Sequence, residues 1–186
     1  MPLVSLRVAD SAGGEFASGV TGEVLVRAPL MFMGYWNKPG ASAQAMQDGW
    51  YHMGDLGRRE EGGFLHIVDR AKDMIISGGE NICPTEVELA LQKLPGVRMC
   101  AVIGMPDEKC CERVVAVIIR DSTIGLTEET VIAHCRPFIA HYKAPRQVEL
   151  LDAFPVTPTG KVKKATLRQR LTMAAAKLEN GNMALR

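Results

Sequence analysis

The stretch DRAKDMIISGGENICPTEVE, residues 69–88, separates two sequence patterns and decides the fold. Short alternating strands and glycine-rich turns precede it, whereas strands and helices alternate after it. Pro84 suits the first position of a helix, and Glu86 and Glu88 suit the positive end of its dipole. A helix is therefore expected from Pro84, and Pro95-Gly96 ends it. Its apolar face is expected to comprise Val87, Ala90, Leu91 and Leu94.

The sequence after this helix predicts an α/β (α+β) unit over residues 69–178, a small mixed sheet with flanking helices, in the order βαββαβα. Strands are expected near residues 97–104, 114–119 and 147–151. A helix opened by Thr127 precedes the last of these strands, and Pro137 predicts a kink or an early end in it. A final helix carries Leu167, Leu171 and Leu178 along one stripe, and residues 179–186 form a tail.

Residues 1–68 form a β-rich region in which no helix of any length is expected. Strands are predicted at residues 3–8, 22–27 and 64–68, separated by turns such as Gly13-Gly14 and Gly62-Gly63. So few strands can hardly close a barrel or a sandwich by themselves. The chain also opens almost inside its first strand, with no leader, so this region is interpreted as incomplete.

Composition places the chain among ordinary globular proteins. Of its 186 residues, 47% are hydrophobic and 23% charged, which excludes a disordered or collagen-like chain. No apolar run approaches the roughly 18 residues that span a bilayer, and no export signal is recognisable, so a cytoplasmic location is expected. The five cysteines show neither disulfide-framework nor zinc-ligand spacing and are interpreted as reduced thiols.

The positive charge is concentrated at the C-terminal end. Residues 161–186 carry seven Lys or Arg and one acidic residue, although the net charge of the chain is only +1. Such a segment attracts phosphates of any origin, so a nucleotide, CoA and a nucleic acid are all admissible. A merely solvated helix face explains the same charges.

Three motifs carry candidate chemistry. FPVTPTGKVKK, residues 154–164, presents Lys161 on a Pro/Gly turn. It is not a Walker A loop, because Val162 replaces Ser or Thr and Pro155 replaces Gly. The lysine either faces a phosphate or is solvated.

The second motif, GWYHMGDLG at residues 49–57, places Asp55 on a tight turn. A carboxylate there can accept hydrogen bonds from both vicinal hydroxyls of a ribose, although Asp is also a common turn former. In the third motif, residues 69–88, Gly78-Gly79 before the helix allows close approach of a ligand, or is a plain turn. Lys72 in the same motif fits a surface charge at a domain boundary equally well.

Taken together, in this order and spacing, the three motifs strongly resemble the C-terminal motifs of the adenylate-forming superfamily. That superfamily comprises acyl-CoA synthetases, peptide-synthetase adenylation domains and luciferases. The resemblance covers about residues 2–175. It implies that residues 1–68 are part of the last β-subdomain of a large domain, and that residues 69–178 are a complete mobile lid domain.

The resemblance also implies a reaction and a role for each motif residue. A carboxylic acid attacks the α-phosphate of ATP to give an acyl-adenylate and pyrophosphate, and the thiol of CoA or of a carrier protein then displaces AMP. Asp55 is expected to bind the ribose hydroxyls, and Arg70 to assist at the ribose or the phosphate. Lys161 matches the catalytic lysine that bridges the attacking carboxylate and the α-phosphate, where its charge offsets the developing negative charge.

Two further elements follow from the same resemblance. Lys72 occupies the hinge position about which the lid rotates between the two half-reactions. Gly78, Gly79 and Glu80 match the loop that lines the pantetheine tunnel of CoA. Two departures, Met53 before Gly-Asp and Cys110-Cys111 where relatives often have Trp-Gly, touch no proposed catalytic atom.

The leading hypothesis is thus the C-terminal fragment of an acyl-CoA synthetase for a fatty or related acid, expected to be inactive alone. Its partners are ATP, the acid, CoA and the missing large domain, with no nucleic acid and no membrane span. The phosphate loop, the adenine-stacking aromatic residue, the Mg²⁺ ligands and the acid pocket are expected in that large domain, and no metal site in this chain. Two alternatives stay open: a peptide-synthetase adenylation fragment, and a non-catalytic nucleotide- or partner-binding module that completes a split ligase.

Overall fold

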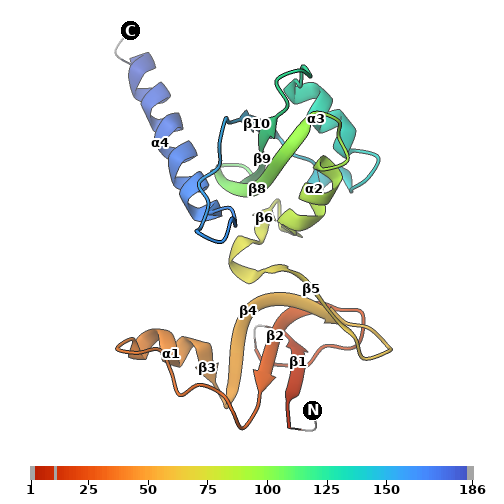
Figure 1. Cartoon of the computed structure of the whole chain (residues 1–186), viewed down its shortest axis with the longest axis vertical. Helices are drawn as coiled ribbons and strands as arrows, with labels where there is room; N and C mark the ends of the chain where they lie inside the picture. Colours follow the sequence, from red (N-terminus) through yellow and green to blue (C-terminus); the bar gives the residue numbers. More distant parts are fainter. Residues whose placement is uncertain (1–2, 11, 184–186) are drawn as a thin grey trace. The chain divides into compact units, whose positions relative to one another are not determined.

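The computed structural model describes residues 3–10 and 12–183, with side chains described as far as residue 174 (Figure 1). The chain forms two compact units that divide after Lys72. The division falls four residues later than the sequence pattern suggests. The physical reason is that strand β5, Leu65–Arg70, continues the first sheet as far as Arg70.

The first unit is a five-stranded antiparallel sheet in the order β1-β2-β4-β3, with β5 also paired to β4. Its elements are β1 Ser5–Ala9, β2 Thr21–Arg27, α1 Pro39–Ala45, β3 Met46–Gln47, β4 Trp50–Arg59, β5 Leu65–Arg70 and the 3₁₀ turn η1 Ala71–Asp73. The three predicted strands are confirmed, with ends shifted by one or two residues.

Two expectations for this unit are wrong. A helix does exist: α1 begins with Pro39 and buries none of its residues, so it lacks the apolar stripe that reveals a helix in sequence. Residues 49–57 are also not a tight turn, because all but the first belong to the ten-residue strand β4. Gly54 and Gly57 lie inside this strand and gave it the appearance of a turn.

The core of the first unit is small. Ala9, Leu25 and Trp50 form its main cluster, and Val8 and Val24 are also buried. The Cζ atoms of Arg7 and Arg27 lie 4.3 and 4.6 Å from the centroid of the Trp50 ring. These cation–π contacts hold the three strands on which the residues lie.

The second unit has one central sheet. Its elements are β6 Ile75–Ser77, β7 Glu80–Ile82, α2 Pro84–Leu91, β8 Val97–Asp107, β9 Cys111–Arg120, α3 Glu128–Cys135, the 3₁₀ turn η2 His141–Lys143, β10 Gln147–Leu150 and α4 Lys164–Met183. The antiparallel partner β8 lies along all of β9 on one edge, and the other edge pairs with β10 and β6. Because β10 runs parallel to β9, the mixed sheet expected from the sequence is confirmed.

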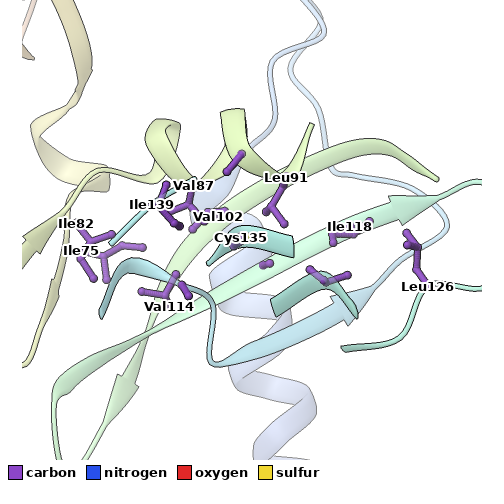
Figure 2. Packing of buried hydrophobic residues seen from close by; sticks show 14 residues of the cluster. Ile75, Ile82, Val87, Leu91, Val102, Val114, Ile118, Leu126, Cys135 and Ile139 are labelled. Atoms are coloured by element: carbon purple, nitrogen blue, oxygen red, sulfur yellow. The ribbon is translucent and has the colours of Figure 1, made fainter. Parts of the chain in front are cut away.

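Strand β9 is buried on both faces, and its side chains alternate between two cores. Val114, Ala116 and Ile118 pack with α2 and α3 in the core shown in Figure 2. Their neighbours Val115, Val117 and Ile119 pack with Phe154 and Leu167 on the opposite face, where α4 lies. Helices therefore cover both faces of this sheet (Figure 1).

The helix starts follow their sequence signals, but α2 ends at Leu91, before the expected stop at Pro95-Gly96, so Leu94 lies beyond the helix. Helix α2 begins at Pro84 and buries Val87, Ala90 and Leu91, as predicted. Helix α3 begins with a capping box formed by Thr127 and Thr130 and ends at Cys135, before Pro137. The strand expected before α2 is instead the hairpin β6–β7, so Gly78-Gly79 is a hairpin turn.

The last helix, α4, extends past the predicted end of the lid domain at residue 178. It continues to Met183, into the segment expected to be a tail. Leu167 and Leu171 pack on the sheet, whereas the packing predicted for Leu178 lies outside the described side chains. Within the described part of the chain, no helix combines the length and the apolar character needed to cross a bilayer.

Candidate functional site

Asp55 lies where strand β4 is irregular on both edges. Between the pairs Leu25–His52 and Glu23–Leu56, three residues of β4 face a single residue of β2. On the other edge the register with β5 shifts directly after Leu56. A bulge re-aims the side chains of a strand, and bulges are frequent beside active sites. Gly54 adopts φ +67, which glycine tolerates at little cost.

The bulge brings Asp55 and Arg70 together. The two residues are directly opposed in the β4–β5 ladder, and Arg70 Nε lies 2.8 Å from Asp55 Oδ1. The carboxylate is 18% exposed and the guanidinium 54%. Among the described residues the second oxygen of Asp55 has no polar partner, so it is open to a ligand hydroxyl.

Lys72 lies in the 3₁₀ turn η1 at the end of the first unit. Its side chain is exposed and takes part in no ion pair with a described residue. The sequence places it near Arg70, and the structure places the division between the units directly after it.

The hairpin turn Gly78-Gly79 offers bare backbone. Both glycines have positive φ, +62 and +85, and a Cβ built on either one meets no atom within 4 Å. The amide of Gly78 donates to the carbonyl of Cys110 at 2.9 Å, and Glu80 is exposed on the outgoing strand. The turn is thus anchored at its base to the turn that precedes β9, and it is open at its tip.

Lys161 stands at the end of a closed loop. The Thr157 amide donates to the Lys161 carbonyl at 2.8 Å, and the Lys161 amide donates to Thr157 Oγ1 at 3.1 Å. Gly160, with φ +80, completes the turn. The loop is held to the second core because Phe154 and Val162 pack there.

The ammonium group of Lys161 is exposed, and no acidic side chain in the described part of the chain pairs with it. Lys143 differs, because its Nζ lies 2.9 and 2.7 Å from the two carboxylate oxygens of Glu86. That hydrogen bonding raises the pKa of Lys143, and its positive charge is already paired with Glu86. The charge of Lys161 is free to meet an anion.

The predicted site residues therefore fall into two groups. Asp55, Arg70 and Lys72 belong to the first unit, and the Gly78-Gly79 turn and Lys161 belong to the second. The structure joins Asp55 to Arg70 directly. Glu23, which the sequence interpretation missed, contacts the β4 bulge beside Asp55.

The described side chains do not meet the requirements of a metal site. Across residues 3–10 and 12–174, no group of three His, Cys, Asp or Glu side chains could hold a metal ion. Among the described residues no two cysteines are joined by a disulfide. The first unit offers a carboxylate–guanidinium pair, and the second offers an unpaired cation and an open backbone turn.

Comparison with known proteins gives one consistent result. Residues 86–161 match the family described as AMP-binding enzyme C-terminal domain. The chain is 42% identical over 165 residues to a feruloyl-CoA synthase of an Amycolatopsis species, covering 89% of the chain and 34% of that protein. It is 40% identical over 156 residues to the long-chain-fatty-acid–CoA ligase FadD13 of Mycobacterium tuberculosis, covering 84% of the chain and 31% of that protein.

The solved structures agree. ATP-bound MatB from Rhodopseudomonas palustris superposes with a TM-score of 0.85 at 37% identity, covering 91% of the chain and 34% of MatB. The chain thus spans about a third of the length of the relatives it matches.

Proposed function

Because the chain carries the C-terminal domain of the AMP-binding enzyme family, an adenylate-forming family, we propose that it is the C-terminal part of an acyl-CoA ligase. In the first half-reaction a carboxylate oxygen attacks the α-phosphate of ATP, and the bond to pyrophosphate breaks. In the second, the CoA sulfur loses its proton and attacks the acyl carbon, and AMP leaves.

The extent of the likeness carries this proposal. The alignment to feruloyl-CoA synthase covers 165 residues, which is more than either unit contains. Both units therefore take part in the likeness, and a shared lid domain alone does not account for it. The names of the relatives supply the reaction class, since both are CoA ligases or synthases.

Asp55 and Arg70 are proposed to hold the ribose of ATP. With Oδ1 engaged by Arg70, the orientation of the carboxylate is restricted, and Oδ2 is left to accept a hydrogen bond from a ribose hydroxyl. Arg70, half exposed, retains N–H donors for the ribose or the phosphate. Binding energy at the ribose positions the α-phosphate for attack.

Lys161 is proposed to act during adenylation. Negative charge builds on the oxygens of the α-phosphate and the attacking carboxylate as the new bond forms, and an ammonium group between them offsets it. The closed Thr157–Lys161 loop fixes the backbone of this lysine before the substrate arrives. No acidic partner has to be displaced first.

Lys72 and the Gly78-Gly79 turn are proposed to serve the second half-reaction. A 3₁₀ turn between two compact units is a short segment that can absorb a change of backbone angles, as a hinge requires. The glycine turn, bare of side chains, lets a narrow chain such as pantetheine pass close to the backbone.

The rest of the site is proposed to lie in an N-terminal large domain. Mg²⁺ accompanies ATP in such reactions, but the described side chains form no site for it, so its protein ligands are proposed to lie in the N-terminal large domain. Leu30, Met33 and Trp36 of the first unit are almost fully exposed and are proposed to contact that large domain.

The acid is proposed to be a fatty or related acid. The relatives differ on this point, since one is named for ferulate and another for long-chain fatty acids. Acid-dependent ATP/pyrophosphate exchange tests the proposal in a chimera, in which this chain replaces the C-terminal third of MatB or FadD13. The isolated chain is expected to show no exchange. A chimera that folds but neither exchanges pyrophosphate nor forms a CoA thioester contradicts the proposal.

The same assay separates the alternatives. A peptide-synthetase fragment would support exchange but not transfer to free CoA. A non-catalytic module would bind nucleotide or the large domain and give neither activity.

A further inference from the structure

Glu23 contacts the strand that carries Asp55 at two points. Its Oε2 lies 2.9 Å from His52 Nδ1, and its Oε1 accepts a hydrogen bond from the Gly54 amide at 3.3 Å. Both side chains of the pair are partly buried, with Glu23 27% and His52 24% exposed. One carboxylate thus bridges the residue before the bulge and a residue inside it.

The Gly54 amide needs this acceptor because of the bulge. No residue of β2 pairs with Met53, Gly54 or Asp55. The backbone groups of these residues on that edge therefore have no hydrogen-bond partner in the ladder. Glu23 is the last β2 residue before the register shifts, and its side chain takes the place of the missing ladder bond. A half-buried backbone N–H without an acceptor is costly, so this contact favours one shape of the bulge.

That shape determines where Asp55 points. Gly54 has φ +67 and immediately precedes Asp55, and glycine by itself would allow many backbone conformations. On the far edge, Arg70 fixes one carboxylate oxygen of Asp55 at 2.8 Å. The bulge is therefore held from both sides, by Glu23 through the backbone and by Arg70 through the side chain.

We propose that Glu23, with His52, is a positioning residue for nucleotide binding: it holds the β4 bulge so that the Asp55 carboxylate is presented to the ribose. This inference rests on the proposed function for the ligand, but the positioning itself is a property of the chain. Glu23 touches neither ATP nor the acid and acts only through Asp55.

The first test uses the 186-residue chain and needs no activity. Hydrogen exchange of the Gly54 amide, followed by NMR, should become about tenfold faster in Glu23→Ala. The loss of a hydrogen bond to a charged group shifts the equilibrium between closed and open amide by about that factor or more. Glu23→Gln keeps an acceptor for the Gly54 amide, so this amide should exchange nearly as fast as in the parent chain. Glu15→Ala is the matched control, since Glu15 pairs with Arg7 and Arg59 of the same sheet but does not contact the bulge. Unchanged Gly54 exchange in Glu23→Ala overturns the inference.

The second test asks whether the bulge matters for ATP. In the MatB chimera, Glu23→Ala should raise the KM for ATP about tenfold while the KM for the acid stays the same. In an Asp55→Ala background the same change should have no further effect, because Glu23 acts through Asp55. Equal rises in both KM values, or additive effects of the two substitutions, would show a merely structural role and refute the positioning role.

The two tests keep the hypotheses apart. If the parent chimera lacks pyrophosphate exchange, the proposed function fails, and the Gly54 measurement still decides the positioning role. If the chimera is active and the KM for ATP does not respond to Glu23→Ala, the inference fails and the proposed function stands.

Discussion

Lys164, in the first turn of α4, forms a 2.8 Å ion pair with Glu88 of α2, and fewer than a fifth of either side chain is exposed. The same carboxylate oxygen of Glu88 accepts a hydrogen bond from the Val102 amide at 2.8 Å. Glu88 thus ties α2, β8 and the start of α4 together. Because the loop of Lys161 leads directly into α4, this tie also fixes where the loop ends.

Removing Glu88 and removing Lys164 should lower the free energy of unfolding by different amounts. Glu88→Ala leaves a largely buried ammonium and a backbone amide unpaired and should destabilise the second unit by about 3 kcal/mol. Lys164→Ala leaves Glu88 still bound to Val102 and should cost only about 1–2 kcal/mol. Urea unfolding followed by the β8 and β9 amide signals measures both values. Equal costs would contradict this account.

Cys111 predicts a stabilising substitution. Its φ of +71 is left-handed, a conformation that costs a residue with a Cβ about 1–2 kcal/mol. Cys111→Gly should therefore raise the stability of the second unit by about 0.5–1 kcal/mol, after the larger entropy of glycine in the unfolded chain is counted. Cys111→Ala keeps the strain and should leave the melting temperature nearly unchanged. A glycine variant less stable than the alanine variant argues against strain.

Lys161→Ala should impair one half-reaction selectively. In the chimera, loss of one preorganised cation should slow adenylation by about 10²–10³, or about 3–4 kcal/mol, by analogy with loss of an oxyanion-hole donor. Thioester formation from preformed acyl-adenylate should change little. Lys163→Ala is the matched control, because Lys163 is also exposed beside the loop. Similar losses in both half-reactions would refute the assignment.

Lys72 predicts the opposite selectivity. Proline at this position fixes φ and should obstruct rotation between the half-reactions, so thioester release should fall while pyrophosphate exchange persists. Lys72→Ala should be mild, because the side chain is not expected to take part in chemistry. If the proline variant releases thioester normally, the hinge lies elsewhere.

The Asp107 carboxylate is expected to stabilise the folded chain, and this stabilisation should be lost when acid protonates it. Hydrogen bonds from the Cys110 thiol and from the amides of Lys109 and Cys110 lower the pKa of this carboxyl in the folded chain. A depressed folded pKa stabilises the fold above the unfolded value of about 3.9, and this contribution is lost as pH falls through the folded pKa. Cys110→Ala should raise the Asp107 pKa toward its ordinary value. NMR titration of the Asp107 carboxyl carbon tests this, and an unchanged pKa would exclude the thiol as the main cause.

Local signals explain what the sequence could predict. Pro84 and Thr127 mark helix starts by their own backbone and capping chemistry, and both helices begin there. The alternation in β9 appears as an unbroken apolar run, which identifies a buried strand. In contrast, α1 buries no residue, and β4 contains two glycines, so neither shows the periodicity of its type.

The candidate site residues could be named one by one from the sequence, but their arrangement could not. Asp55 and Arg70 were each found from motifs, but their opposition depends on bulges on both edges of β4. Bulges depend on tertiary pairing and leave only Gly54 as a local sign. Glu23 was missed for the same reason, because it reaches the bulge from a strand about thirty residues upstream.

The double burial of β9 also limits which sequences this fold accepts. A strand with one solvated face tolerates polar residues at every second position, whereas residues 114–119 face a core on either side. In a library of single substitutions this segment would form an uninterrupted block of intolerance. Tolerated variation is therefore expected at the two ends of β9, and Cys110-Cys111 stand at its first end.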